Sequence, residues 1–127
     1  MALTLSQPAV RTSPDRSLQL ALAAAREAED NRGQNVTVLD MREQGVEFDY
    51  FVIATGTSNR QLRAMSDAID DVLQKQYGHR RLGREGYEES HWLVLDYGSV
   101  VIHLFDEPTR DFYRLEELWG GATPVAR

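Results

Sequence analysis

Hydrophobic residues recur along this chain with two different spacings. In residues 13–30 and 58–78 they return every three or four positions, which is the period of an amphipathic helix. In residues 36–54 and 91–105 they form short runs of β-branched, aliphatic and aromatic side chains, which is typical of strands. This order of elements predicts a single α/β (α+β) domain, in which flanking helices pack on a mixed sheet of about five strands.

The first helix has a marked start and stop in the sequence. Ser13 can cap its N-terminus, Pro14 suits the first helical position, and Asp15 supplies an acid to the first turn. Residues 31–33, Asn-Arg-Gly, are a typical helix stop. One face of this helix carries small and aliphatic side chains: Leu18, Ala21, Leu22, Ala25 and Ala28. We expect this face to pack closely against the rest of the domain.

Two strands are expected next, at residues 36–41 and 48–54. Both carry apolar residues on both faces, which favours central positions in the sheet. Ser58 and Gln61 then match a capping box at the start of the longest helix, which should end near Gly78. The apolar stripe of this helix consists of Leu62, Met65, Ile69, Val72 and Leu73. A polar segment follows, with a short extended piece expected at residues 81–84.

Residues 91–105 read HWLVLDYGSVVIHLF and predict a β-hairpin. With Tyr97 and Gly98 as a two-residue loop, the expected cross-strand partners are Trp92 with His103, Val94 with Val101 and Asp96 with Ser99. One face is wholly aliphatic and is expected to be core: Leu93, Leu95, Val100, Ile102 and Leu104. The other face mixes aromatic, aliphatic and polar side chains: Trp92, Val94, Asp96, Val101, His103 and Phe105. This mixed face is the candidate surface for binding a partner.

A last helix is predicted to start at Glu107 and to stop at Gly120. Its expected buried stripe consists of Phe112, Leu115, Leu118 and Trp119. Tyr113 falls off this stripe, and because tyrosine is enriched at protein interfaces, it joins the candidate contact residues. The predicted domain therefore spans residues 13–120, between a flexible N-terminal tail, 1–12, and a C-terminal tail, 121–127.

The segment TGTS at residues 55–58 has three interpretations: a phosphate-binding loop, the opening of a nucleotidyltransferase site, or a capped turn. A phosphate loop needs more glycines than Gly56 alone and a lysine nearby. Nucleotidyl transfer needs paired carboxylates on a strand to hold divalent metal. The sequence has neither, and Asp70 and Asp71 fall on the long helix, where a solvated face is the simplest expectation. We interpret the segment as a capped turn, and a nucleotide-binding enzyme is the less favoured alternative.

No other pattern indicates catalysis or metal binding. His79, His91 and His103 lack the short spacing of metal ligands, and no combination of serine, histidine and acid stands out as a nucleophilic triad. The chain also has no cysteine, which excludes a thiolate site and fits a reducing compartment. We therefore expect no catalytic residue, no cofactor and no metal. His103 is expected to be either a hydrogen-bonded sheet residue or a contact to a partner.

Charge and length narrow the function classes further. A chain of 127 residues favours one domain, and its net charge of -6 argues against a dominant nonspecific nucleic-acid binder and favours a basic protein partner; we expect no direct sequence-specific binding of nucleic acid. No apolar run is long enough to cross a membrane, so we expect no membrane partner. The cytoplasm, or the interior of an organelle, is the expected location.

Three blocks of the sequence resemble a known family. They read DYFVIATGTSNRQ from residue 49, GREGYEESHWLVLDYGSVVIHLF from residue 83 and TRDFYRLEELWG from residue 109. The chain resembles the ribosomal silencing factor family, also called Iojap-like proteins, from about residue 18 to residue 120. This resemblance implies a fold similar to that of nucleotidyltransferases, without their catalytic carboxylates.

The resemblance also implies a function. Family members bind the large ribosomal subunit through its ribosomal protein number fourteen, at the face where the small subunit docks, and so block subunit joining and repress translation. Carried over by position, the contact residues are Trp92, Asp96, His103 and Tyr113; the mixed hairpin face adds Val94 and Phe105. A role in assembly of the large subunit through the same surface stays an open alternative, and so does a homodimer.

Overall fold

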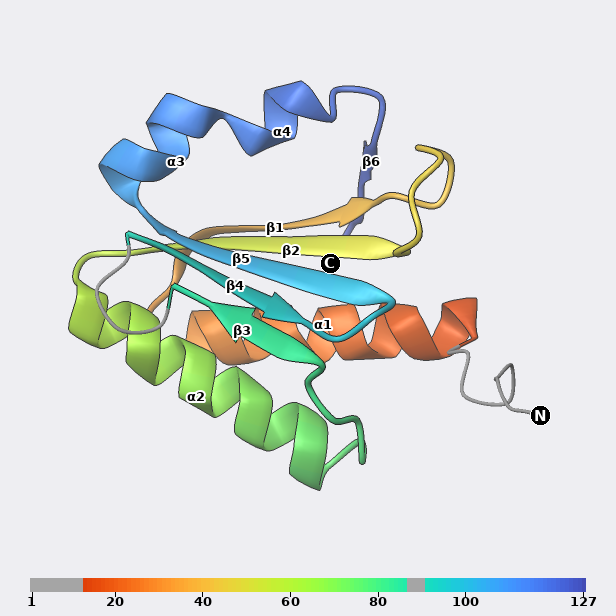
Figure 1. The fold of residues 1–127 in the computed structure, drawn as a ribbon, viewed down its shortest axis with the longest axis horizontal. Coiled ribbons are helices and arrows are strands. Elements are labelled where there is room, and N and C mark those ends of the chain that lie inside the picture. Colours follow the sequence, from red (N-terminus) through yellow and green to blue (C-terminus); the bar gives the residue numbers. More distant parts are fainter. Residues whose placement is uncertain (1–12, 87–90) are drawn as a thin grey trace.

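The computed structural model describes residues 13–86 and 91–127, which form one layered α/β domain (Figure 1). The elements in chain order are α1 (Pro14–Asp30), β1 (Gln34–Asp40), β2 (Tyr50–Gly56), α2 (Asn59–Lys75), β3 (Gly83–Glu85), β4 (Trp92–Asp96), β5 (Val100–Asp106), α3 (Glu107–Tyr113), α4 (Leu115–Leu118) and β6 (Thr123–Pro124). The predicted fold class is confirmed, although the described residues form six strands instead of about five. The expected N-terminal tail, 1–12, lies outside the described residues.

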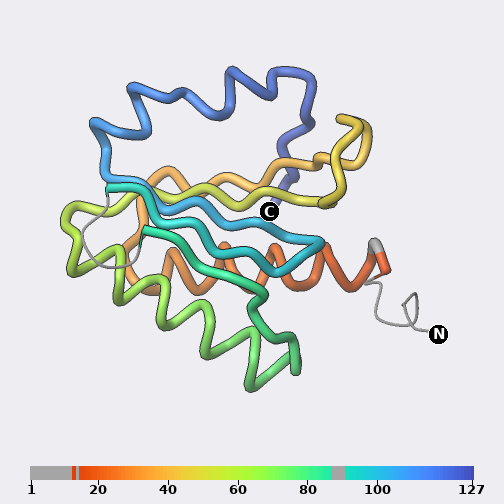
Figure 2. The backbone as a smooth tube through the Cα atoms, viewed as in Figure 1, coloured from red at the N-terminus to blue at the C-terminus, as the bar shows by residue number. Residues whose placement is uncertain are grey.

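The strand order across the sheet is β3-β4-β5-β2-β1-β6, and the path of the chain through it can be followed in Figure 2. Strands β2 and β5 run parallel, while every other neighbouring pair is antiparallel. The parallel pair has a structural consequence: the carboxyl ends of β2 and β5 meet at one edge, and α2 and α3 begin there. Strand β6 comes from the segment 121–127, which was expected to be a tail, and pairs with β1.

Helices α1 and α2 cover one face of the sheet, and the larger core cluster lies beneath them (Figure 1). The aliphatic face of the hairpin is confirmed as core, because all five of its predicted side chains are buried in this cluster. The predicted stripe of α2 is confirmed except for Val72, which is only partly buried. In α1 the prediction is partly wrong, since Leu20 and Ala24 are buried while Leu18 and Leu22 are partly exposed. Because α1 packs against both the sheet and α2, its buried side is broader than a single stripe.

The two predicted serine caps are confirmed. Ser13 accepts a hydrogen bond from the backbone N–H of Arg16, and Ser58 accepts one from that of Gln61. The Gln61 side chain reaches back to the N–H of Thr57, one residue earlier than expected, and also donates to the carbonyls that end α1. Gly56 allows close packing here, because a Cβ atom at this position would lie 2.7 Å from the Leu62 side chain. The TGTS segment is a capped turn that joins α2 to α1.

The hairpin differs from the predicted register by two residues. Trp92 pairs with Phe105, Val94 with His103 and Asp96 with Val101, so the loop consists of residues 98 and 99. Gly98 adopts φ +85°, which suits the glycine favoured at the first position of a type II′ loop. Because a shift of two residues preserves the alternation of side chains, the assignment of residues to the two faces stays correct.

The register shift moves Tyr97 from the turn into the core under α2. Its side chain is buried, and its hydroxyl donates a 2.7 Å hydrogen bond to Asp70. Burial and the neighbouring carboxylate raise the pKa of the Tyr97 phenol. Asp70 also pairs with Arg81 at 2.9 Å, so the expectation of a solvated carboxylate is wrong for Asp70, although Asp71 is exposed.

The other face of the sheet is covered in part by α3 and α4, above a smaller core cluster (Figure 1). A single helix was predicted here, but the chain breaks at Arg114, which adopts φ +47° in the left-handed region. The break changes the phase of the apolar stripe. Leu115 is buried as expected, whereas Phe112 is 80% exposed and Leu118 is 71% exposed, so their predicted burial is wrong.

Candidate partner-binding surface

The six predicted contact residues come from β4, β5 and α3, and the structure brings them to the face of the sheet that α1 and α2 leave free. Trp92 is at their centre: its ring lies 4.8 Å from that of Phe105 and 4.8 Å from that of Tyr113, between ring centroids. Val94 follows Trp92 along β4 and is partly buried. Asp96 ends the strand, exposed, and its carboxylate accepts a hydrogen bond from the N–H of Gly98.

His103 and Phe105 lie beneath this surface. Phe105 is fully buried and His103 is 7% exposed, so they support Trp92 from below. The Trp92 indole N–H donates a 3.0 Å hydrogen bond to Nδ1 of His103. Nδ1 is therefore the unprotonated nitrogen, and the ring proton is on Nε2, which has no hydrogen-bond partner among the described residues. Burial lowers the pKa of His103 to about 4, so the imidazole is neutral at neutral pH.

Phe51, on the neighbouring strand β2, completes the support under this surface. Its ring meets the His103 ring edge to face, with 4.6 Å between centroids, and lies 6.2 Å from that of Trp119. The orientation of the Trp92 indole is thus fixed by one hydrogen bond and by rings packed beneath and beside it. This fixed aromatic platform can bind an apolar or aromatic side chain of a partner without much further ordering.

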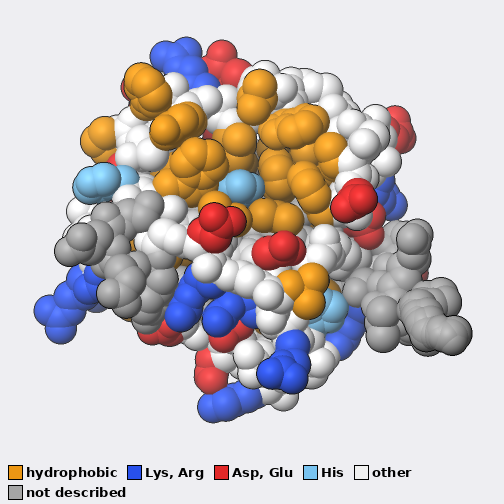
Figure 3. Space-filling model, viewed as in Figure 1, with side chains coloured by type: hydrophobic (Ala, Val, Ile, Leu, Met, Phe, Trp, Pro, Cys, Tyr) orange, Lys and Arg blue, Asp and Glu red, His pale blue; other side chains and the backbone are white. Residues whose placement is uncertain are grey.

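The outward side of the platform is more apolar than the sequence predicted. Tyr113 is 51% exposed, and the exposed Phe112 ring meets its edge at 5.0 Å between centroids. Hydrophobic side chains gather on this face of the molecule, with acidic side chains beside them (Figure 3). We call Trp92, Val94, Phe112 and Tyr113 the aromatic patch. Sequence reasoning assigned Phe112 to the core, because it assumed an unbroken helix through Arg114.

Asp106 fixes where α3 begins, and so where Tyr113 lies. Its carboxylate accepts the N–H of Thr109 at 2.9 Å as the N-cap, and lies 2.6 Å from Nδ1 of His91. Burial alone would raise the pKa of Asp106, but the hydrogen bonds from Thr109 and the interaction with His91 outweigh it, so the pKa is lowered. The cap therefore stays ionised at neutral pH. With α3 following β5 without a loop, Tyr113 is placed over the hairpin.

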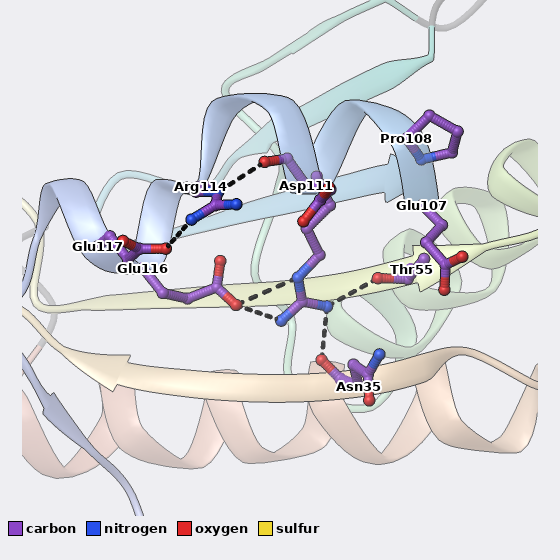
Figure 4. A pocket seen from close by; sticks show the side chains of 9 residues that line it. Asn35, Thr55, Glu107, Pro108, Asp111, Arg114, Glu116 and Glu117 are labelled. Atoms are coloured by element: carbon purple, nitrogen blue, oxygen red, sulfur yellow. Dashed lines mark hydrogen bonds and ion pairs between the residues drawn. The ribbon is translucent and has the colours of Figure 1, made fainter.

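A hollow of about 690 Å³ lies on the other side of α3, near the carboxyl ends of β2 and β5 (Figure 4). Its lining includes Thr55, Glu107, Arg110, Arg114 and Glu117. The Arg110 guanidinium donates hydrogen bonds to Asn35, Thr55 and Glu116. Arg114 pairs with Glu117 at 3.2 Å. An incoming phosphate would therefore have to displace these ion pairs. Among the described residues, no group of three or more histidines or acids is placed to hold a metal ion.

Comparison with known proteins places this chain in a family. Residues 14–126 match the model of the family described as "Ribosomal silencing factor during starvation". Ribosomal silencing factor RsfS of Halalkalibacterium halodurans is 37% identical over 108 residues, covering 85% of this chain and 89% of that protein. RsfS of Bacillus subtilis is 37% identical over 109 residues, covering 86% and 88%.

A solved structure agrees with these matches. The crystal structure of protein CV0518 from Chromobacterium violaceum superimposes with a TM-score of 0.75 at 34% identity, covering 90% of this chain and 92% of that one. The sequence matches and the shared fold both extend over nearly the whole chain. This chain belongs to the ribosomal silencing factor family.

Proposed function

We propose that this protein binds the large ribosomal subunit through a basic ribosomal protein at the subunit interface, ribosomal protein number fourteen in the family resemblance. While bound, it blocks the small subunit from docking and thereby represses translation. Family membership supports a role at the ribosome. The choice of surface rests on the contact between Trp92 and Tyr113, in which Tyr113 is 51% exposed and Trp92 is partly buried, on the sheet face that α1 and α2 leave free.

The physical basis of binding is the aromatic patch. Tryptophan and tyrosine provide a large contact area at a small cost in conformational entropy, and they are enriched among residues that dominate binding energy. Phe112 extends the apolar area around this centre, at the expense of exposing apolar surface in the free protein. A partner that covers the patch removes this surface from water, which favours association.

Charge supports a basic partner. The chain carries a net charge of -6, and the exposed Asp96 borders the aromatic patch on β4. Proteins that contact RNA phosphates are rich in lysine and arginine, so an acidic border attracts them and disfavours direct contact with RNA. The protein then acts by occupying a surface in the cytoplasm or an organelle interior, with no substrate turnover.

Co-sedimentation with isolated large subunits tests the docking surface. We expect Trp92→Ala or Tyr113→Ala to weaken binding by roughly 2 kcal/mol, about thirtyfold, because each removes a central aromatic contact. Leu82→Ala is the matched control, since Leu82 is 72% exposed and lies beside the hairpin loop, at the far end of β4 from Trp92. Unchanged binding by both aromatic variants would exclude this face.

Two alternatives use the same chain differently. An assembly factor for the large subunit would need the aromatic patch for binding but would leave subunit joining unaffected. A nucleotide-binding enzyme is favoured by the hollow near the carboxyl ends of β2 and β5. Calorimetry with nucleoside triphosphate and magnesium decides the second alternative: saturable binding that disappears in Arg114→Ala would support it, and no heat of binding would reject it.

A further inference from the structure

Arg110 crosses from α3 to the sheet and to α4. Its side chain is 11% exposed. Nη1 of the guanidinium donates hydrogen bonds to the Thr55 hydroxyl (2.8 Å) and to the Asn35 carbonyl (2.6 Å). Nη2 donates to the Thr37 hydroxyl (3.3 Å) and to Glu116 (2.6 Å), and Nε donates to Glu116 (3.2 Å). Figure 4 shows part of this network. All five N–H donors of the guanidinium are used within the protein, so Arg110 is built into the fold and is not left free for a ligand.

The Arg110–Glu116 pair spans the break at Arg114. In a continuous helix, residues six positions apart lie about 120° apart around the axis and cannot meet. Here the left-handed Arg114 turns the chain, and Glu116 returns to within 2.6 Å of Arg110. The ion pair therefore forms only in the broken conformation, and it stabilises that conformation over a single straight helix.

Apolar packing alone does not hold α3 in place. None of its seven residues is buried, and its Phe112 and Tyr113 are 80% and 51% exposed. Arg110 supplies the missing attachment, because it ties α3 to β1 and β2 on one side while Tyr113, three residues later, packs on Trp92 of β4 on the other. The position of the Tyr113 ring is thus coupled to the bonds that Arg110 makes.

We propose that Arg110 is the positioning residue of the docking surface: through Glu116 and the polar groups of β1 and β2, it holds the broken α3–α4 segment so that Tyr113 lies against Trp92. This inference rests on the proposed function. Without Arg110, α3 loses its hydrogen bonds to β1 and β2 and stays fixed to the sheet only at its start, at Asp106, so Tyr113 leaves Trp92 for part of the time. The aromatic patch then has to be ordered when the partner binds, which lowers affinity.

The first test uses the free protein, so it does not depend on the ribosome. Arg110→Ala, Arg110→Lys and Glu116→Gln are compared with the parent chain by the NMR resonance of the Trp92 indole N–H, assigned with Trp92→Phe. We expect Arg110→Ala to move this resonance as far as Tyr113→Ala does, and Arg110→Lys and Glu116→Gln to move it less. An unmoved resonance in folded Arg110→Ala overturns the proposal.

The second test asks whether Arg110 acts on binding through Tyr113. A double-mutant cycle measures affinity for large subunits at a temperature where thermal unfolding shows every variant to be folded. We expect Arg110→Ala to weaken binding about tenfold in the parent chain and less than about twofold when Tyr113 is already alanine. Equal losses in both backgrounds overturn the positioning role. If the parent chain itself does not bind large subunits, the proposed function fails, while the indole resonance still decides whether Arg110 positions Tyr113.

Discussion

At the scale of single residues, His103 shows how burial determines the chemistry of the candidate surface. Its Nδ1 accepts the Trp92 N–H, while its Nε2 is buried without a partner among the described residues. An imidazolium could not accept that hydrogen bond and would be charged in an apolar environment, so the folded state favours the neutral ring. The sequence left open whether His103 is a hydrogen-bonded sheet residue or a partner contact, and in the structure it is hydrogen-bonded to Trp92 and buried.

This neutral histidine predicts a pH dependence of stability. The pKa of His103 is lowered from 6.5 to about 4, so between these values the unfolded chain binds more protons than the folded protein. The free energy of unfolding should be unaffected by His103 above pH 6.5 and should fall by up to about 3 kcal/mol as the pH drops to 4. Urea unfolding at pH 7 and pH 5 measures this change.

His103→Gln separates this contribution from that of the acids. Carboxyls with lowered pKa values, such as that of Asp106, also lose stabilising interactions at low pH, and both chains share this loss. The variant should be less stable at pH 7, but its stability should fall less between pH 7 and pH 5. An equal fall in the free energy of unfolding for the two chains would contradict the prediction, because it would mean that His103 has the same pKa in the folded and the unfolded state.

Among the helices and strands, the sequence correctly predicted the features that depend on a few adjacent residues. Ser13 and Ser58 cap the nearest backbone N–H groups, so the starts of α1 and α2 follow from a few adjacent residues. The faces of the hairpin were also correct, because alternation survives a shift of two residues. The register itself was wrong, since Tyr97 enters the core to reach Asp70, a contact between segments far apart in the chain.

The break between α3 and α4 is the feature that local sequence did not reveal. Arginine favours helices and rarely adopts the left-handed conformation, so nothing at Arg114 indicated a stop. The contact of Arg110 with Glu116 and the sheet is tertiary, and it outweighs the local preference. The alternation of side chains along β4 placed Trp92 on the candidate surface, and Tyr113 joined it because it lies off the apolar stripe of the last helix. Phe112 and Leu118 were assigned to the core because the helical period was extended through Arg114, where the helix breaks.

Substitutions at Arg114 test this break directly. At φ +47° a glycine avoids the steric cost of a side chain, so Arg114→Gly should be more stable than Arg114→Ala by about 1 kcal/mol. Both variants lose the ion pair with Glu117, which therefore cancels in the comparison. Thermal or urea unfolding of the two variants gives the difference. A continuous helix through residue 114 would reverse its sign, because alanine is then favoured by about 1 kcal/mol.

At the scale of the whole molecule, the sheet divides the protein by role. The face under α1 and α2 holds the larger core, built from aliphatic and small side chains. The other face is only partly covered by α3 and α4, and it presents the aromatic patch beside acidic side chains (Figure 3). This arrangement suits a protein that acts by covering part of a larger particle, because one face maintains the fold while the other is free to bind.

Binding at the aromatic patch is proposed to exclude the small subunit. The most direct measurement adds the protein to separated large and small subunits and determines the fraction of joined ribosomes by sucrose-gradient sedimentation. The parent chain and Leu82→Ala should reduce this fraction in proportion to the large subunits occupied, while Trp92→Ala and Tyr113→Ala should reduce it only at roughly thirtyfold higher concentration. An undiminished fraction of joined ribosomes at saturating parent protein would contradict the claim.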